Sequence, residues 1–463
     1  MELFSDKPGD EGLSGRERRL ATIAVMTSTT MAVFDGAMVN IALPQIARAL
    51  NVTAQAAVWV ANGYLLSAAM TLAIFAALGT RFGFRALFVF GLGVFTLASL
   101  GCALSSTLPM LTGFRILQGI GGAATLSIAP AILRSVYPNR LLGRILGLNA
   151  LLIAASTAIA PLLGGTLLST LGWQWLFAIN LPLGLVALLL ARRVIPAASL
   201  SGREPFDVAG AVLSALMLGA LIMTAEAFSS PGKHTMNALV YALIALVSGG
   251  SFAWHSLRIP KPLLPPALFA SARFSLAALT SLASFVSQGM TFVALPFLFQ
   301  SVYGYSAFAS ALLFTPWPLG IILAAPWAGR LADRHPPAVI STLGLGLFAV
   351  GLVLLALLPA DPNVWDIGVR SLVCGLGFGF FQSPNNREML ANASRAHSGY
   401  ASGVLAIMRT FGQCLGAALV GALLSLAGHA QEAHAVHLSL WVAVAATICA
   451  LLLSLSRTRH SPV

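Results

Sequence analysis

Asp35 is the residue whose type and position point most directly to chemistry. It stands 15 residues beyond Leu20, where the first apolar stretch begins. In a helix, this places it about 22 Å from one edge of a ~30 Å hydrocarbon layer. An acid at such depth is costly and is a functional candidate, with a role in proton uptake and release. The alternative interpretation is a fixed ion pair that only holds helices together.

Arg115 is the expected partner of Asp35. The fourth apolar stretch begins near Pro109 at the opposite edge, so Arg115 lies about 9 Å below that edge, while Asp35 lies about 8 Å below it. Arginine keeps its charge, so its expected role is to control the protonation of Asp35 and the access of water. A purely structural salt bridge is the alternative here too.

The remaining charged residues within apolar stretches are less informative. Asp366 and Arg370 are four residues apart and are expected to neutralise each other on one helix face. Arg409 has no acid near it in the sequence, and it either faces a cavity or binds backbone carbonyls. Glu226 and Glu388 fall near the ends of apolar stretches, where a solvated carboxylate costs little, so we expect structural roles for them.

Neither a metal site nor a cofactor site is expected, and the protein is not expected to be an enzyme. His429, His434 and His437 are loosely spaced, which favours a solvated loop. Glycine-rich segments such as 119–122 and 375–379 have no preceding strand and no Gly-Lys-Ser/Thr, so close helix packing explains them better than nucleotide binding. The four cysteines have no metal-ligand spacing and are interpreted as buried thiols.

Composition indicates that membrane-spanning helices position these residues. The chain has 463 residues, 58% hydrophobic and 9% charged, with a mean hydropathy of +0.87. Soluble proteins carry about 25% charged residues, so lipid must cover most of this surface. The apolar runs lack the alternation of barrel strands, which predicts an all-α polytopic membrane protein. No removable signal peptide is expected.

Charges, prolines and polar clusters divide the chain into fourteen spans of about 20 residues. The predicted spans are 20–43, 57–78, 86–105, 110–132, 145–168, 174–191, 208–227, 237–257, 275–300, 309–328, 339–358, 364–386, 401–426 and 438–455.

The placement of Lys and Arg predicts the orientation. If both termini are cytoplasmic, 21 of the 26 basic residues lie in inner loops and tails, and only Arg48 and Lys233 lie outside. Arg115, Arg370 and Arg409 fall within spans. This asymmetry follows the positive-inside rule and predicts a multi-pass protein of the cell (inner) membrane. It also explains the net charge of +12 without a nucleic-acid partner.

Several segments resemble the major facilitator superfamily, specifically its fourteen-span drug:proton antiporter branch. The segments are 34–44 (Phe-Asp-Gly-Ala-Met-Val-Asn-Ile-Ala-Leu-Pro) in the first helix, 115–122 (Arg-Ile-Leu-Gln-Gly-Ile-Gly-Gly) in the fourth, 160–165 (Ala-Pro-Leu-Leu-Gly-Gly) in the fifth, and 173–182 before and within the sixth. Each is weak alone, but their order and spacing together are specific. The loops at 76–85 and 329–334 also echo each other, as in a protein built from two parallel halves.

The resemblance implies a domain organisation of two six-helix bundles with two extra linker helices. The expected parts are an N-terminal cytoplasmic tail (1–19), an N-terminal bundle (20–193), a linker with two transmembrane helices (194–272), a C-terminal bundle (273–456) and a cytoplasmic tail (457–463).

The resemblance also implies gating roles for the motif residues. Thr80 stands where the family usually has an aspartate that latches the cytoplasmic side, so the latch of the first half could be weaker than that of the second. The implied gating residues are Arg81, Gly83, Arg85, Pro161, Gly164, Gly165, Gly329, Asp333 and Arg334.

Substrate contacts are inferred from aromatic, methionine and amide residues on helices that line cavities in the family. Such side chains suit amphipathic, often cationic ligands, although each is equally compatible with packing. The candidates are Phe34, Met38, Trp59, Asn62 and Tyr64 in the first half, and Phe285, Gln288, Phe292, Phe381 and Asn385 in the second.

The resemblance therefore implies a monomeric, proton-coupled exporter of small amphipathic compounds that works by alternating access. Its partners are the small-molecule substrate, protons and membrane lipid. Two alternatives stay open: export of an anionic or zwitterionic metabolite, suggested by the embedded arginines, and a transporter-like sensor without turnover, suggested by Thr80.

Overall fold

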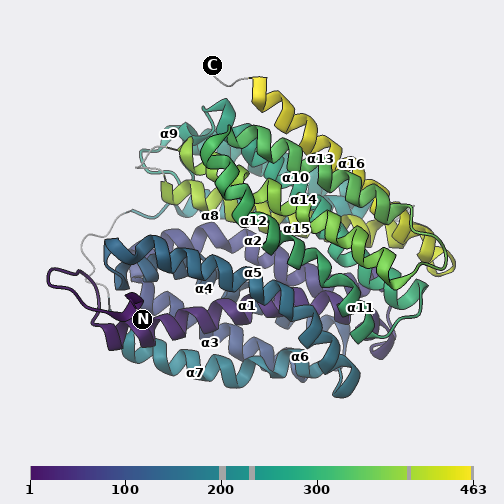
Figure 1. Cartoon of the computed structure of the whole chain (residues 1–463), viewed down its shortest axis with the longest axis horizontal. Coiled ribbons are helices and arrows are strands. Elements are labelled where there is room, and N and C mark those ends of the chain that lie inside the picture. The colour runs from purple at the N-terminus through teal and green to yellow at the C-terminus, as the bar shows by residue number, and fades with distance from the viewer. Residues whose placement is uncertain (1, 198–204, 229–234, 394–397, 460–463) are drawn as a thin grey trace.

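The computed structural model is a bundle of long helices lying side by side (Figure 1). It describes residues 2–197, 205–228, 235–393 and 398–459. Within those ranges the regular structure is entirely helical. The α-helices are α1 (Gly15–Ala49), α2 (Ala54–Phe82), α3 (Phe84–Ala103), α4 (Leu108–Val136), α5 (Asn139–Thr170), α6 (Gln174–Ala178), α7 (Asn180–Val194), α8 (Val208–Phe228), α9 (Thr235–Arg258), α10 (Ala272–Phe297), α11 (Ala307–Phe314), α12 (Pro316–Arg334), α13 (Pro337–Ala356), α14 (Val364–Ala391), α15 (Ser398–Ala427) and α16 (Glu432–Arg459).

These elements make fourteen traverses of the bundle. Two traverses are each built from a pair of helices, α6 with α7 and α11 with α12, and α10 continues into a π-helical segment, Leu298–Val302. Thirteen segments among the described residues are long and apolar enough to cross a membrane. The remaining traverse, α5, has 32 residues, enough to span ~30 Å. The predicted all-α, fourteen-span architecture is confirmed.

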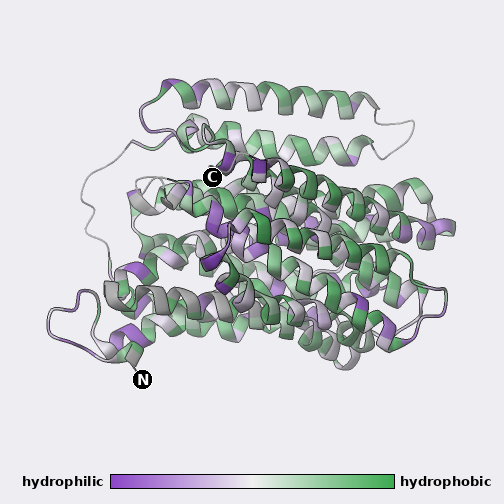
Figure 2. Cartoon of the chain, turned by 45° about the horizontal axis from the view of Figure 1, so that its top comes forward, coloured by the Kyte–Doolittle hydropathy of each residue, from purple (hydrophilic) through white to green (hydrophobic). Residues whose placement is uncertain are grey.

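The helices extend beyond most of the predicted spans because a helix can continue past the apolar layer. Glycines with positive φ end or separate some of them: Gly83 (φ 88°) lies between α2 and α3, and Gly172 (φ 109°) precedes α6. Figure 2 shows the consequence for polarity, with apolar colouring along the helices and polar segments mainly near their ends.

Helices α1–α7 and α10–α16 form two groups. In Figure 1 the first group lies below the second. In the first, α4 packs on α2 and α3, and α1 packs on α5 and α7; in the second, α14 packs on α12 and α13, and α10 packs on α15 and α16. The pair α8–α9 contacts both groups, because α8 touches α2 and α15. The exact domain boundaries stay a prediction.

Contacts between several pairs of helices join the groups. Helix α2 packs on α15, and α5 packs on α11 and α12. The helices alternate in direction, so we refer to the end where α1 begins as the Gly15 end and to the opposite end as the Ala49 end. The Gly15 end is the one that the charge pattern predicts to be cytoplasmic.

Candidate functional site

Asp35 and Arg115 form an ion pair inside the first group of helices. Arg115 Nη1 donates to Asp35 Oδ2, and the two side chains are 0% and 1% exposed. Asp35 comes from α1 and Arg115 from α4, so 80 residues separate them in the sequence. The meeting expected from their matching depths is therefore present.

Backbone and aromatic groups hold Arg115 on its other sides. Its Nε donates to the carbonyl of Val60 at 2.7 Å, and its guanidinium carbon lies 4.6 Å from the ring centre of Tyr64 and 5.6 Å from that of Phe177. A guanidinium over an aromatic face gains electrostatic attraction. Helices α2 and α6 therefore help to fix the position of the cation that faces Asp35.

Two amides complete the shell around the carboxylate. Gln118 Nε2 donates to Asp35 Oδ1 at 3.0 Å and to Ser99 Oγ at 2.8 Å, while its Oε1 accepts from Arg115 Nη1 at 2.7 Å. Asn180 Nδ2 lies 3.4 Å from the same carboxylate oxygen and 3.3 Å from Ser99 Oγ. All of these side chains are at most 2% exposed. Together with Arg115, they make one connected network that joins α1, α3, α4 and α7.

This network links the charge on Asp35 to the packing of several helices. With Asp35 ionised, the buried charges of the pair compensate each other. Adding a proton to Asp35 removes that compensation and leaves the Arg115 cation buried with only neutral acceptors, which is costly. The arrangement can therefore convert protonation of one carboxyl into a change in how α1 and α4 hold together.

Gln118, Asn180 and Ser99 were not predicted as site residues. Gln118 and Asn180 lie within the two motif segments 115–122 and 173–182, so the motifs could have pointed to them. Gln118 is also three residues after Arg115, which places it on the same helix face. Neutral amides in an apolar run carry no charge, so the depths of acids and bases in the sequence do not mark them as site residues.

Of the predicted substrate residues in the first half, one contacts the Asp35 network and two contact helices outside the first group. Tyr64 stacks on Arg115. Trp59 donates its indole N–H to Glu226 of α8, and Asn62 accepts from Cys414 Sγ of α15 at 3.0 Å. Phe34 is half-buried and Met38 is buried on α1. Their contact with substrate stays a prediction.

Aromatic packing surrounds the predicted substrate residues of the second half. Phe285 and Phe381 both pack edge-on against Phe378, with ring centres 5.4 and 5.6 Å apart, and Phe292 packs in the same way against Trp317 at 5.3 Å. These contacts are those of a bundle core.

The two polar candidates of the second half are also hydrogen-bonded. Gln288 accepts from Gln413 at 3.3 Å, and Asn385 accepts from Arg457 at 2.6 Å. A role in binding substrate stays a prediction for both.

The gating residues of the 76–85 loop lie at the Gly15 end. Arg81 is exposed and lies over the ring of Phe82 at 5.7 Å, while Gly83 adopts the positive φ that separates α2 from α3. Arg85 donates to the carbonyl of Arg192 at 2.5 Å. The side chain of Thr80 lies outside the part that the structure describes, so its effect on the latch stays a prediction.

The motif in α5 lies where the two groups of helices meet. Pro161 is inside α5, and Gly164 packs against Met38 of α1. Gly165 faces α11, and a Cβ there would come 2.9 Å from the Ala307 carbonyl oxygen. Only glycine lets the two backbones approach this closely.

The corresponding loop of the second half is less informative. Gly329 has open space around it, and Arg334 is exposed at the end of α12. Asp333 belongs to the same helix, but its side chain lies outside the described part of the structure. Gating roles for these three residues stay predictions.

Comparison with known proteins identifies the family. The profile of the Major Facilitator Superfamily matches residues 25–417. The chain belongs to this superfamily.

Relatives within the superfamily cover nearly the whole chain. It is 41% identical over 455 residues to the uncharacterized transporter YebQ of Escherichia coli K12, covering 97% of this chain and 98% of that protein. It is 30% identical to the tetracenomycin C resistance and export protein of Streptomyces glaucescens, covering 89% and 77%, and 26% identical to the riboflavin transporter RibZ of Clostridioides difficile, covering 94% and 96%.

Solved structures show the same fold. A POT family peptide transporter in an auto-inhibited form superimposes with a TM-score of 0.72 at 14% identity, covering 96% of this chain and 98% of that one. A bacterial homologue of the lysosomal transporter Spinster, in an inward-facing conformation, gives 0.68 at 16% identity, covering 99% and 100%. The chain is thus a multi-pass membrane transporter of the superfamily.

A second buried ion pair in this superfamily transporter corrects two expectations. Glu388 is 7% exposed rather than solvated, and Arg457 is completely buried in α16 rather than in a tail. Arg457 Nη1 lies 3.2 Å from Glu388 Oε2, and Nη2 donates to Ser454 Oγ at 2.8 Å. The helix extends further than its apolar run, and its Ser454–Arg457 face turns toward α14.

The other charged residues follow the expectations more closely. Asp366 and Arg370 form the predicted ion pair at 2.9 Å. Glu226 is half-buried and accepts the hydrogen bond from Trp59. Arg409 of α15 is half-buried, and among the described residues no carboxylate pairs with it.

Proposed function

We propose that this transporter is a proton-coupled antiporter that exports small amphipathic, mainly cationic compounds by alternating access. The observation that carries the proposal is the buried Asp35–Arg115 pair with its amide shell of Gln118 and Asn180. An ionisable pair inside a transporter bundle is expensive and is typical of proton and substrate pathways. The predicted orientation, with both termini cytoplasmic, belongs to this proposal.

In the proposed cycle, Asp35 takes up a proton from outside and releases it inside. Protonation weakens the ion pair, and the freed guanidinium of Arg115 keeps its bonds to Val60 O and Gln118 Oε1. This change weakens the contact between α1 and α4, and the weaker contact favours opening of the transporter to one side of the membrane. One coupling carboxyl implies about one proton exchanged for a monovalent cation.

Named relatives support the direction of transport. Besides the tetracenomycin C resistance and export protein, the chain is 29% identical to the methylenomycin A resistance protein of Bacillus subtilis 168, covering 86% of this chain and 85% of that protein. Export of toxic small molecules, as in multidrug efflux and antibiotic resistance, is therefore the activity we infer here.

One observation favours an anionic or zwitterionic substrate as the second candidate. Arg409 lies within α15, where that helix packs on α2, and no described carboxylate neutralises it. A cation in this position would attract a substrate carboxylate or phosphate. One relative is named as a riboflavin transporter, so the names of the relatives are not limited to drug exporters.

The deciding experiment is transport into proteoliposomes with an imposed pH gradient, using cationic, zwitterionic and anionic compounds in parallel. The proposal expects cation transport that depends on the gradient and is lost in Asp35→Asn. Transport restricted to anions, and lost in Arg409→Gln but retained in Arg409→Lys, would replace it with the second candidate. Ligand binding without transport of any compound would indicate a sensor.

A further inference from the structure

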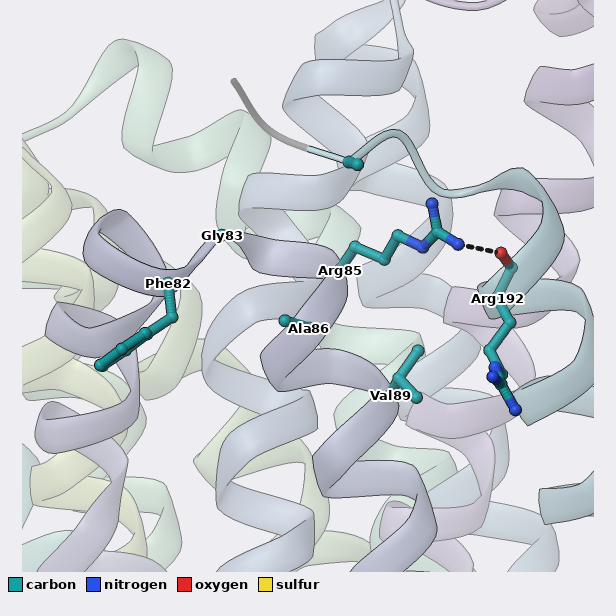
Figure 3. Close-up of a pocket in the computed structure, with 7 residues that line it drawn as sticks. Phe82, Gly83, Arg85, Ala86, Val89 and Arg192 are labelled. Carbon is teal, nitrogen blue, oxygen red and sulfur yellow. Dashed lines mark hydrogen bonds between the residues drawn. The ribbon is translucent and has the colours of Figure 1, made fainter. Parts of the chain in front are cut away.

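A pocket of about 320 Å³ opens at the Gly15 end, far from the Asp35 network along the helix axes. It lies between the turn that joins α2 to α3 and the last turn of α7 (Figure 3). Its lining consists of Phe82, Gly83, Arg85, Ala86, Val89, Arg192 and Ala197.

Two guanidinium groups give this pocket its charge. Arg85 reaches from α3 to the end of α7, where it donates to the Arg192 carbonyl oxygen at 2.5 Å, and the Arg192 side chain runs from the same turn to the level of Val89, away from the Arg85 guanidinium (Figure 3). A guanidinium has five N–H donors, so this bond leaves most of Arg85's donors available. Among the described residues, neither guanidinium pairs with a carboxylate.

The first turn of α3 adds backbone donors to the same place. Gly83 precedes the helix with φ 88° and provides no side-chain cap. The first amides of a helix, here those of Phe84, Arg85 and Ala86, have no intrahelical acceptor. They carry the positive end of the helix dipole, which favours an anion.

Exposed apolar side chains continue from the pocket along both helices. Phe90 on α3 is 50% exposed, and Leu185, Val186 and Leu189 on α7 are 52–55% exposed. Phe82, in the pocket itself, is 56% exposed. These helices lie at the edge of the first group, away from the second (Figure 1). The pocket therefore lies at the end of two helices that carry exposed apolar side chains, which suit hydrocarbon chains.

We propose that this pocket binds the phosphate of an anionic phospholipid, with its acyl chains lying along α3 and α7. Phosphate matches the planar donor geometry of arginine, and basic pockets between helices at a membrane face are suited to anionic headgroups. The exposed apolar side chains on α3 and α7 favour a lipid over free phosphate. This site is independent of the transported substrate and of the coupling role proposed for Asp35.

The test is native mass spectrometry of the purified full-length protein with phosphatidylglycerol and phosphatidylcholine that carry identical acyl chains. At about 1 kcal/mol per basic residue near a headgroup, two arginines predict a preference for phosphatidylglycerol of about tenfold to thirtyfold. The Arg85→Gln/Arg192→Gln variant should bind the two lipids within about twofold of each other.

A matched variant, Arg193→Gln/Arg330→Gln, removes two exposed charges at the same end of the bundle that do not line the pocket. It should keep the wild-type preference. If the double pocket variant does not fold, Arg192→Gln alone, at an exposed position, should lower the preference by about fivefold. Three results would each overturn the proposal. They are equal binding of both lipids by the wild-type protein, the same loss of lipid preference in the matched variant as in the pocket variant, and displacement of the lipid by millimolar inorganic phosphate.

Discussion

Asn180 and Gln118 both direct their amide nitrogens at Asp35 Oδ1, at 3.4 and 3.0 Å, although they stand 145 and 83 residues from it in the chain. The other oxygen, Oδ2, faces Arg115. The carboxylate is thus held from α4 and α7 at once. A change in the charge of Asp35 therefore alters its bonds to both α4 and α7. Such bonds make Asp35 suitable as a coupling group.

Replacing Gln118 by Ala should destabilise the first group of helices. The change removes the hydrogen bonds of Gln118 to Asp35, Arg115 and Ser99, all of them between buried groups, which costs about 1–3 kcal/mol of unfolding free energy. Thermal unfolding in detergent measures this loss. Gln174→Ala, at an exposed position in α6, should change the unfolding temperature little. An equal effect of the two substitutions would contradict the network.

Replacing Arg457 by Gln should be strongly destabilising, because it leaves the Glu388 carboxylate buried without its cation. Breaking a buried pair from one side costs about 3–5 kcal/mol. Adding Glu388→Gln should recover part of the loss, which a double-mutant cycle of unfolding temperatures can measure. The control is Arg459→Gln, an exposed arginine two residues further along α16. If Arg457→Gln and Arg459→Gln have the same unfolding temperature, the buried pair is not a stabilising contact.

The linker helices should loosen at low pH. Burial raises the pKa of Asp207, but hydrogen bonds from Gly210 N, His255 and Leu263 N lower it more, so the net pKa lies below its usual value. The stabilisation is therefore present above about pH 4, the unfolded-state value. It is lost as the pH falls through the lower folded-state pKa.

Asp207→Asn provides the comparison for this pH effect. At pH 7 the variant should unfold at a lower temperature than the wild-type protein, and the difference should shrink as the pH falls toward 3. A difference that is constant across this range would show that the charge of Asp207 does not stabilise the α8–α9 pair.

Gly165→Ala should impair the contact between the two groups of helices. The added methyl group would lie 2.9 Å from the Ala307 carbonyl oxygen and 2.9 Å from the Ala311 methyl, an overpacking that costs about 1–3 kcal/mol. Transport and unfolding temperature should both fall. Gly93→Ala on α3, where the methyl meets nothing within 4 Å, should change neither, and similar losses in both variants would argue against a tight α5–α11 contact.

The sequence predicted the architecture well because two independent signals agree. Apolar runs predict where the spans lie, and the positions of Lys and Arg predict on which side of the membrane each connecting loop lies. The Asp35–Arg115 pair was predictable for a related reason. The position of a charged residue within an apolar run gives its depth in the membrane, and the depths of Asp35 and Arg115 match.

The parts that could not be predicted depend on which way a helix face turns. Arg457 follows an apolar run and therefore suggested a solvated tail, but α16 continues and buries it against Glu388. Asn180 and Gln118 are neutral, so nothing in the apolar pattern marks them. Only the packing of α4 and α7 around α1 shows that their amides reach one carboxylate.

The most direct test of the coupling claim is proton release on substrate binding. A transported compound, identified by the proteoliposome screen, is added to weakly buffered detergent-solubilised protein, and the pH is followed with an indicator dye. We expect release of about one proton per bound monovalent cation, and none from an Asp35→Asn variant that still folds and binds the compound. Undiminished release from Asp35→Asn would contradict the assignment of Asp35 as the coupling group.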